Sequence, residues 1–408
     1  MSPRPHKGHW LSLFLPFALG YYLSYLLRTV NAVISPDLTG ELALSASDLG
    51  LLTSAYFIAF GLAQIPLGIA LDRFGPRRVN LALLLLAALG AVSFALGETM
   101  LELSLARALI GLGVSACLMS GLKAFSLWYP PARQSSMTGF IMAAGALGAL
   151  TAATPLEALL PFLGWRGVFW LIAVLALGVA AYLALCVPEA PPVQKEQSFG
   201  QALASLGTIF ASPYFRRFAG TALLFTGGFM ALQSLWAVPW LMQVEGLSRS
   251  GAAGMLLFLN LGMLLGQLSI GFFGNALARR GVRPLHLLRF GYGLVLLVEL
   301  LIVCRLGGGS AFLWLLFGVL SAVNAQVYVA ASSHFPREAF GRVSTAMNLM
   351  AFAGAFLVQW LVGVLFDALA AAGRTPEAAL TVAFVALMLA QVLVLLPLLR
   401  REVGAQTN

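Results

Sequence analysis

Long apolar runs, such as residues 81–96 and 379–399, constrain this chain more than any other feature of its sequence. An α-helix needs about 20 apolar residues to cross a bilayer, whereas the strands of a membrane barrel alternate apolar and polar residues. Only 10% of the residues are charged, against about 25% in ordinary soluble domains, so the chain could not cover a surface that faces water. The sequence therefore predicts an all-α membrane protein.

The hydrophobic segments divide the chain into two halves. The longest polar stretch, residues 188–212, begins with prolines that end a helix, and it predicts a cytoplasmic linker with a short interfacial helix near residues 198–210. We expect six transmembrane helices in residues 1–187 and six in residues 213–408. The twelve predicted segments are 10–36, 47–70, 78–97, 100–127, 135–160, 165–187, 214–243, 251–277, 285–304, 310–333, 342–366 and 378–400.

The distribution of basic residues predicts the orientation of these helices. With the N-terminus inside the cell, seventeen of the 24 Lys and Arg residues fall in inside loops and four in outside loops, as the positive-inside rule requires. The net charge of +9 is thus loop charge and does not indicate nucleic-acid binding. We expect an inner-membrane protein with both termini in the cytoplasm. The outside four are Arg166, Arg249, Arg305 and Arg374, and the remaining three, Arg28, Arg107 and Lys123, lie inside predicted helices.

A repeated trio of residues relates the two halves. The first copy lies at the inner end of the second predicted helix, and the second copy, 203 residues later, lies at the inner end of the eighth. Internal repeats of this kind are typical of transporters, in which one half rocks against the other. The copies are Gln64, Gly68 and Asp72, and Gln267, Gly271 and Asn275.

Two motifs carry a resemblance to a known family. The segment Gly68-Ile-Ala-Leu-Asp72-Arg73-Phe-Gly75-Pro-Arg77-Arg78 resembles the loop between the second and third helices in the major facilitator superfamily, and Arg107-Ala-Leu-Ile-Gly111-Leu-Gly113 resembles the fourth-helix motif of that superfamily. The resemblance implies twelve helices in two pseudo-symmetric halves. It also implies a conformational switch loop in which Asp72 and Arg73 make charge contacts that stabilise the outward-facing state. Its expected members are Gly68, Asp72, Arg73, Gly75, Arg77 and Arg78.

The first helix narrows the resemblance. Arg28-Thr-Val-Asn31-Ala-Val-Ile-Ser-Pro36-Asp-Leu38 is similar to the first helix of the organophosphate and anion:cation symporter branches, in which the Arg faces an anionic substrate. Organophosphate exchangers add a second cation on the seventh helix, where this chain has Ala231, Gln233 and Trp236. This departure argues against organophosphate exchange.

Polar residues inside the predicted helices are the candidates for a substrate site. An arginine at membrane depth costs about 3 to 10 kcal/mol, so it is usually paired or functional. Arg28 is expected either to face the cavity between the halves or to reach the outer interface. For Arg107 a structural role and a functional one both stay open, and Lys123 is expected to extend to the inner interface. The proposed substrate-binding set is Tyr25, Arg28, Asn31, Arg107, Gln233, Trp236, Asn324 and Tyr328.

The side-chain spacing adds three expectations about the second half. Phe229, Gln233, Trp236 and Trp240 are spaced to share one helical face, as a cavity wall or as ordinary packing with Trp240 in an interfacial belt. Asn324 and Tyr328, four residues apart, are expected to face the same cavity or to bond neighbouring helices. Glu299 is expected to pair with Arg305 or to lie near the outer end of its helix, and these roles are favoured over carrying a proton.

The function that these features favour is secondary transport of a small organic anion by alternating access, with a proton as the expected coupling ion. Efflux of amphiphilic compounds is one alternative, and a transporter-like ligand sensor is another. The sequence contains no HExxH, GxSxG, nucleotide loop or metal-spaced His and Cys set, so we expect no enzyme, cofactor or metal site. A monomer in the lipid bilayer, with a small-molecule substrate and no nucleic-acid partner, is the expected assembly.

Overall fold

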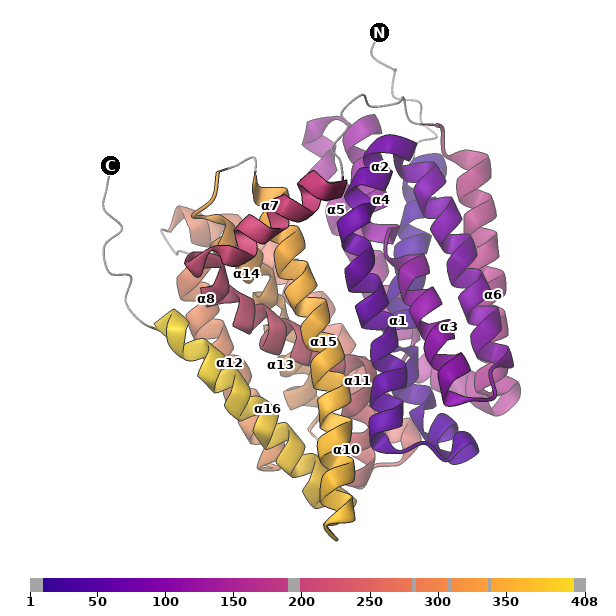
Figure 1. Ribbon diagram of the computed structural model, residues 1–408, viewed down its shortest axis with the longest axis vertical. Coiled ribbons are helices and arrows are strands. Elements are labelled where there is room, and N and C mark those ends of the chain that lie inside the picture. The colour runs from indigo at the N-terminus through magenta and orange to yellow at the C-terminus, as the bar shows by residue number, and fades with distance from the viewer. Residues whose placement is uncertain (1–9, 190–198, 281–283, 307–309, 337–338, 400–408) are drawn as a thin grey trace.

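The computed structural model describes residues 10–189, 199–280, 284–306, 310–336 and 339–399, which form helices in two groups (Figure 1). Among these residues, ten helices are long and apolar enough to cross a membrane. One of them, α2 (Ala46–Leu96), has 51 residues and a break at Gly75, so it supplies two crossings. A shorter apolar helix covers Ser136–Thr151. These helices account for the twelve predicted segments, and the predicted all-α membrane fold is confirmed.

Two glycines divide long helices at turns. Gly75 has φ 77° and Gly164 has φ 62°, backbone conformations that side chains with a Cβ rarely adopt. Gly75 separates the second crossing from the third, and Gly164 separates the fifth from the sixth within α6 (Thr154–Cys186). The glycine of the switch-loop motif is therefore the residue that allows the chain to reverse direction there.

The N-terminal half occupies the right of Figure 1, from indigo to magenta. Its first helix crosses from the upper face of that view to the lower face, where it ends at Leu42. Its elements are η1 (Trp10–Phe14), α1 (Leu15–Leu42), α2, α3 (Met100–Val114), α4 (Cys117–Trp128), α5 (Pro131–Thr151) and α6.

The C-terminal half follows α7 (Phe199–Ala211), which lies across the upper face of the molecule (Figure 1). α7 forms where the sequence predicts a short helix. The seventh crossing is irregular, because two π-helical turns interrupt it, and such turns are frequent at functional sites. Its elements are α8 (Pro213–Thr221), η2 (Ala222–Thr226), α9 (Gly227–Ala231), η3 (Leu232–Trp236) and α10 (Ala237–Gln243).

The other five crossings complete the C-terminal half. The eighth is α11 (Arg249–Arg279) and the ninth is α12 (Pro284–Val303). The tenth combines α13 (Ala311–Ser321), η4 (Ala322–Asn324) and α14 (Ala325–Ser332). The eleventh is α15 (Phe340–Ala371) and the twelfth is α16 (Pro376–Leu399).

Acidic residues at the lower face cap helices. The Ser45 side chain accepts from the backbone N–H of Asp48, and the Asp48 carboxylate accepts from the backbone N–H of Ser45. Thr99 and Glu102 form the same reciprocal box at the start of α3. Each box satisfies backbone donors that a helix N-terminus leaves free. Acids that the sequence places in outside loops thus have a structural role. The predicted cytoplasmic position of the termini concerns residues 1–9 and 400–408, which lie outside the described residues.

Candidate functional site

Arg28 lies near the middle of α1 with 5% of its surface exposed. Its guanidinium carbon is 4.4 Å from the ring centroid of Tyr25, 5.3 Å from that of Phe60 on α2 and 5.6 Å from that of Phe352 on α15. Phe60 and Phe352 stack on each other across the two halves, with centroids 4.4 Å apart. We call Tyr25, Phe60 and Phe352 the aromatic cage. Arg28 therefore sits between the halves, far from either end of its helix.

The charge of Arg28 has no acidic partner among the described residues. The six ion pairs that these residues form do not include it, and the groups that act electrostatically on it are the hydroxyls of Tyr21, Tyr25 and Tyr56. Its Nε is buried without a hydrogen-bond partner. A cation over an aromatic face gains about 0.5–2 kcal/mol, which offsets only part of the cost of burying the charge. The site is complementary to an anion.

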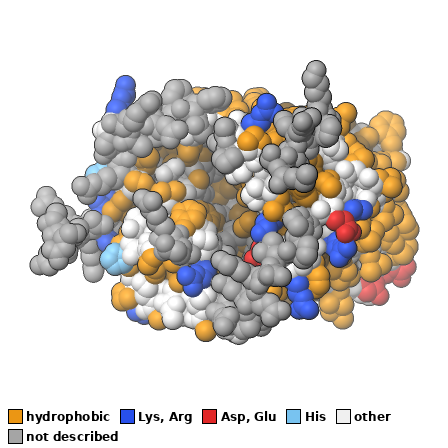
Figure 2. Space-filling view, turned by 90° about the horizontal axis from the view of Figure 1, so that it is seen from above, with side chains coloured by type: hydrophobic (Ala, Val, Ile, Leu, Met, Phe, Trp, Pro, Cys, Tyr) orange, Lys and Arg blue, Asp and Glu red, His pale blue; other side chains and the backbone are white. Residues whose placement is uncertain are grey.

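A cavity of about 520 Å³ adjoins the cage. It is bounded by Tyr25 on α1, by Met142 and neighbouring residues on α5, and by Met263 and Gln267 on α11, so it lies between the halves. Figure 2 looks onto the upper face and shows a depression between the two halves, with Lys and Arg side chains around it. The volume is in the range of small-molecule sites. Because Tyr25 lines the cavity and packs on Arg28, its ring separates the cavity from the guanidinium.

Gln233 reaches the other half through a second amide. Its Nε2 donates to Oδ1 of Asn260 at 2.7 Å, and Nδ2 of Asn260 donates to the backbone carbonyl of Ala149 on α5 at 2.9 Å. Both side chains are buried. Asn260 was not among the predicted site residues, although an amide in the middle of an apolar run is the signal that could have found it. The pair forms a polar link between helices seven, eight and five.

The four residues expected on one face of the seventh helix point to four different helices. Phe229 packs on Phe317 of α13, Gln233 bonds α11, Trp236 donates from its indole to the carbonyl of Gln359 on α15 at 3.0 Å, and Trp240 stacks on Phe384 of α16. The prediction of a shared face is therefore wrong. The π-helical turn η3 lies inside this segment and changes the number of residues per turn, so α-helical spacing does not apply. Trp240 is fully buried and belongs to no interfacial belt.

Asn324 and Tyr328 have different partners. Asn324 accepts from the hydroxyl of Tyr292 on α12 at 3.1 Å, whereas the hydroxyl of Tyr328 donates to Asn348 on α15 at 3.2 Å. Asn324 is the last residue of the 3₁₀ turn η4. Because a 3₁₀ turn has fewer residues per turn than an α-helix, Asn324 and Tyr328 point in different directions although they are four residues apart. Tyr328 is within electrostatic range of Tyr25 and Arg28. Of the two, Tyr328 is the one that the structure brings toward the cage.

Asn31 and Arg107 pack inside the N-terminal half. Asn31 is fully buried and donates to the hydroxyl of Thr53 at 3.0 Å. Arg107 is also fully buried, donates to the carbonyl of Leu27 at 2.9 Å and lies over the ring of Tyr56. The structure thus places Arg107 against Tyr56, whose hydroxyl faces Arg28.

The residues of the switch loop make contacts within the N-terminal half and with the first residues of the linker. Asp72 pairs with Lys123 at 2.7 Å, so Lys123 extends to an acidic partner that was not predicted for it. Arg77 donates to the carbonyl of Ala184, and Arg78 pairs with Glu189 at 2.8 Å. Arg73 lies over the ring of Phe74, and Gly68 is on α2 one turn before Asp72.

We expect Lys123→Met to change stability little. The side chains of Lys123 and Asp72 keep 29% and 52% of their surface exposed, and ion pairs of that kind contribute about 0–1 kcal/mol. A double-mutant cycle with Asp72→Asn, measured by thermal unfolding in detergent, should give a coupling energy below about 1 kcal/mol. A larger coupling energy would contradict this assessment and indicate that the pair holds the loop together.

The lower ends of the two halves are joined by charged side chains that lie far apart in the sequence. Arg249 on α11 pairs with Asp37 on α1 and donates to the carbonyl of Val33 at 2.8 Å. Asp367 on α15 accepts from the backbone N–H groups of Ala46 and Ser47 at 3.1 Å and 2.8 Å. A carboxylate of one half thus caps a helix of the other. We call these contacts the lower latch.

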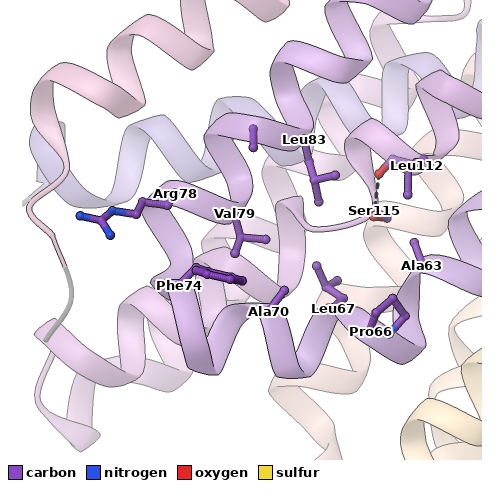
Figure 3. Close-up of a pocket in the computed structure, with 11 residues that line it drawn as sticks. Ala63, Pro66, Leu67, Ala70, Phe74, Arg78, Val79, Leu83, Leu112 and Ser115 are labelled. Carbon is purple, nitrogen blue, oxygen red and sulfur yellow. Dashed lines mark hydrogen bonds between the residues drawn. The ribbon is translucent and has the colours of Figure 1, made fainter. Parts of the chain in front are cut away.

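A separate apolar pocket of about 420 Å³ lies in the N-terminal half. Figure 3 shows Leu67, Phe74 and Val79 around it, the side chain of Arg78 directed away, and the Ser115 hydroxyl bonded to the carbonyl of Leu112. Arg78 is paired with Glu189. This pocket offers no free charge to an anion, in contrast to the surroundings of Arg28.

Comparison with known proteins identifies the family. The family model described as Major Facilitator Superfamily matches residues 17–359, most of the chain. The chain belongs to the major facilitator superfamily. Solved members of similar fold include a bacterial homologue of the human lysosomal transporter Spinster in an inward-facing conformation, with a TM-score of 0.75, 18% identity and 97% of both chains covered. A D-xylose–proton symporter matches with a TM-score of 0.75, 16% identity, and 95% of this chain and 97% of that one covered.

Curated relatives within the superfamily have higher identity. The probable sulfoacetate transporter of Cupriavidus necator is 26% identical over 328 residues, which cover 78% of this chain and 74% of that protein. The probable L-galactonate transporter of Escherichia coli is 32% identical over 165 residues, covering 39% of this chain and 35% of that protein. The hexuronate transporter of Escherichia coli is 28% identical over 183 residues, covering 44% and 40%. The chain thus spans about a third to three quarters of the length of these relatives.

Proposed function

We propose that this member of the major facilitator superfamily is a secondary transporter of a small organic anion. The single observation that carries the proposal is the position of the buried Arg28 guanidinium between the two halves, where it has no carboxylate partner among the described residues. A buried charge without a counter-ion is costly, and a substrate carboxylate or sulfonate supplies one when it binds.

The names of the relatives support the same substrate class. Galactonate, hexuronates and sulfoacetate are small anions, two of them polyhydroxylated carboxylates and one a sulfonate. A charge anchor next to amide and hydroxyl groups suits such molecules. In the proposed site Arg28 binds the anionic group, Tyr25 and Tyr328 adjoin it, and Gln233 shapes the wall through Asn260. The remaining members of the proposed site are Asn31, Arg107, Trp236 and Asn324, of which Asn31 and Arg107 act through the packing of α1.

We further propose transport by alternating access, with proton symport as the working mechanism. The moving halves are residues 1–187 and 213–408, joined by residues 188–212, and the protein works as a monomer in the inner membrane. The basic residues around the upper face favour a cytoplasmic position for it. In that orientation the lower latch closes the outside, and the cavity beside Tyr25 extends along α5 toward its cytoplasmic end, as far as Ser136.

The test is ligand-induced thermal stabilisation of the purified protein. The probes are L-galactonate, glucuronate and sulfoacetate, with galactose as the neutral analogue and tetraphenylphosphonium as a lipophilic cation. A ligand that binds the folded state raises the melting temperature in a concentration-dependent manner. We expect at least one anion to stabilise the protein, by about 2.7 kcal/mol at a hundred times its Kd, and galactose to have no effect.

Two results would overturn the proposal. Stabilisation by tetraphenylphosphonium and by no anion would favour efflux of amphiphilic compounds. Equal stabilisation by galactose and galactonate would show that the carboxylate makes no contact with a cation, and the role given to Arg28 would fail.

A further inference from the structure

Glu299 is an acidic residue buried in the ninth crossing, away from Arg28. It lies on α12 with 9% of its surface exposed, beside a cavity of about 20 Å³ that it shares with Leu232, Trp314, Phe317 and Phe384. Of the two expectations for Glu299, pairing with Arg305 is wrong, because Arg305 pairs with Glu377, whereas a position near the outer end is confirmed, because α12 ends at Val303. Glu299 is therefore a carboxyl group in apolar surroundings, and neither the substrate site nor the lower latch uses it.

Charged neighbours do not compensate Glu299 within the described part of the chain. A carboxylate without a cation is costly at such a position, whereas a neutral carboxylic acid is not. Among the elements packed around it, α13, η3 and η4 have no titratable side chain. The titratable or charged groups on the others are Tyr328 on α14, Glu377 on α16 in its pair with Arg305, and His286, Arg289 and Tyr292 on α12, of which Arg289 donates to the carbonyl of Leu398.

The polar atoms around Glu299 include more acceptors than donors. Nε2 of Gln391 on α16 donates to Oε1 of Glu299 at 3.3 Å and to the carbonyl of Leu224 at 3.3 Å, which uses both of its hydrogens. Oε2 of Glu299 and Oε1 of Gln391 are both buried without a partner. Both atoms are acceptors when the carboxyl is ionised. A proton on Oε2 makes that atom a donor, and Oε1 of Gln391 belongs to the amide whose Nε2 already bonds Glu299, so one added hydrogen bond between the two atoms would satisfy both.

We propose that Glu299 is a proton-binding site of the C-terminal half, in which the protonated carboxyl and the Gln391 amide form a closed acid–amide pair. The proton comes from water and returns to water, and the O–H bond at Oε2 is the bond that forms and breaks. In the ionised form both carboxylate oxygens are acceptors. They then compete with the carbonyl of Leu224 for the two N–H groups of Gln391.

This competition changes a hydrogen bond to the seventh crossing. Leu224, which accepts the second Gln391 hydrogen, belongs to the π-helical turn η2. The backbone of this turn touches α15, since a Cβ on Gly354 would lie 1.8 Å from the carbonyl oxygen of Leu223. α15 is the helix that provides Phe352 to the cage and Asp367 to the lower latch. Protonation of Glu299 thus affects the contact between η2 and α15, and through α15 the closure of the lower latch. This inference rests on the proposed transport function.

Infrared spectroscopy of the protein in lipid nanodiscs at neutral pH tests the proton site without any substrate. Wild type should show a carbonyl band of a protonated carboxylic acid that shifts in D₂O. Glu299→Gln should lose this band, and the control Glu98→Gln, the same change at an exposed position, should keep it. Gln391→Leu should keep the band at a shifted frequency, because the acid loses its amide partner. Absence of the band in wild type, or its full retention in Glu299→Gln, would overturn the proposal.

Transport by reconstituted protein tests the link to function. The probe is the anion among galactonate, glucuronate and sulfoacetate that stabilises the wild type most. Glu299→Gln should exchange this anion across the membrane at a rate within about 2-fold of wild type and should lose uptake driven by a pH gradient by about 10-fold or more. Gradient-driven uptake equal to wild type would overturn the coupling role. If no anion binds to wild type, the proposed function fails, while the infrared result still decides whether Glu299 holds a proton.

Discussion

Replacing Arg28 by Met is expected to abolish anion binding while leaving the ligand-free protein as stable as wild type or more stable. Removing one partner of a buried, hydrogen-bonded charge pair costs about 2–5 kcal/mol, so affinity for the anion should fall by roughly 30-fold to more than 1,000-fold. In the absence of ligand the same change removes a buried charge that has no acidic partner among the described residues. Met keeps most of the side-chain volume inside the aromatic cage, so packing losses stay small.

The two readouts are melting temperature without ligand and its rise with the anion. Arg107→Met is the matched contrast, because Arg107 is also buried without an acidic partner among the described residues, and it differs from Arg28 by donating to the backbone carbonyl of Leu27. It should lower the ligand-free melting temperature, since the carbonyl loses a charged donor. A large loss of ligand-free stability in Arg28→Met, with anion binding retained, would show that Arg28 is a structural cation held by the cage.

Replacing Gly363 by Leu is expected to stop transport by preventing closure of the lower face. A Cβ on Gly363 would lie 2.3 Å from the carbonyl oxygen of Ala46, and a Cβ on Gly50 would lie 2.6 Å from that of Gln359. The backbones of α2 and α15 therefore touch across the two halves where the latch lies. Overpacking costs about 1–3 kcal/mol, which shifts a two-state equilibrium by about 5-fold to 150-fold toward the state without the contact.

Cysteine labelling measures that shift. Ser35 lines the cavity of about 500 Å³ at the lower face but is buried in this closed state, so Ser35→Cys reports opening of that face once Cys186 and Cys304 are replaced by Ser. Labelling should be faster in Gly363→Leu than in the parent. Gly178→Leu is the control, because a Cβ on Gly178 would meet nothing within 4 Å. Unchanged labelling together with normal transport would contradict the assignment of this contact as a moving interface.

The sequence predicted the fold of this protein better than it predicted the contacts of its site residues. Apolar length and proline positions predicted the membrane fold, because a lipid environment permits few backbone solutions and each leaves a long signal in the chain. The switch loop was predicted down to Gly75, whose φ of 77° requires a residue without a Cβ. These features are local, so one stretch of sequence is enough to specify them.

The partners of polar side chains were predicted far less well. Lys123 and Asp72 are 51 residues apart, Arg249 and Asp37 are 212 apart, and Asp367 and Ala46 are 321 apart, so no local spacing relates them. The face shared by Phe229, Gln233, Trp236 and Trp240 failed for a different reason, because the π-helical turn η3 changes the helical period inside the segment.

By itself, the sequence determined that this protein spans a membrane with helices in two related halves and that an arginine lies at depth in the first of them. Hydrophobic burial in lipid is governed by composition along each segment, which the sequence states directly. The tertiary structure alone decided that Arg28 sits in an aromatic cage without an acidic partner in the described chain, and that Glu299 faces Gln391. Such pairings depend on which helices come together, and helix packing is a property of the whole bundle.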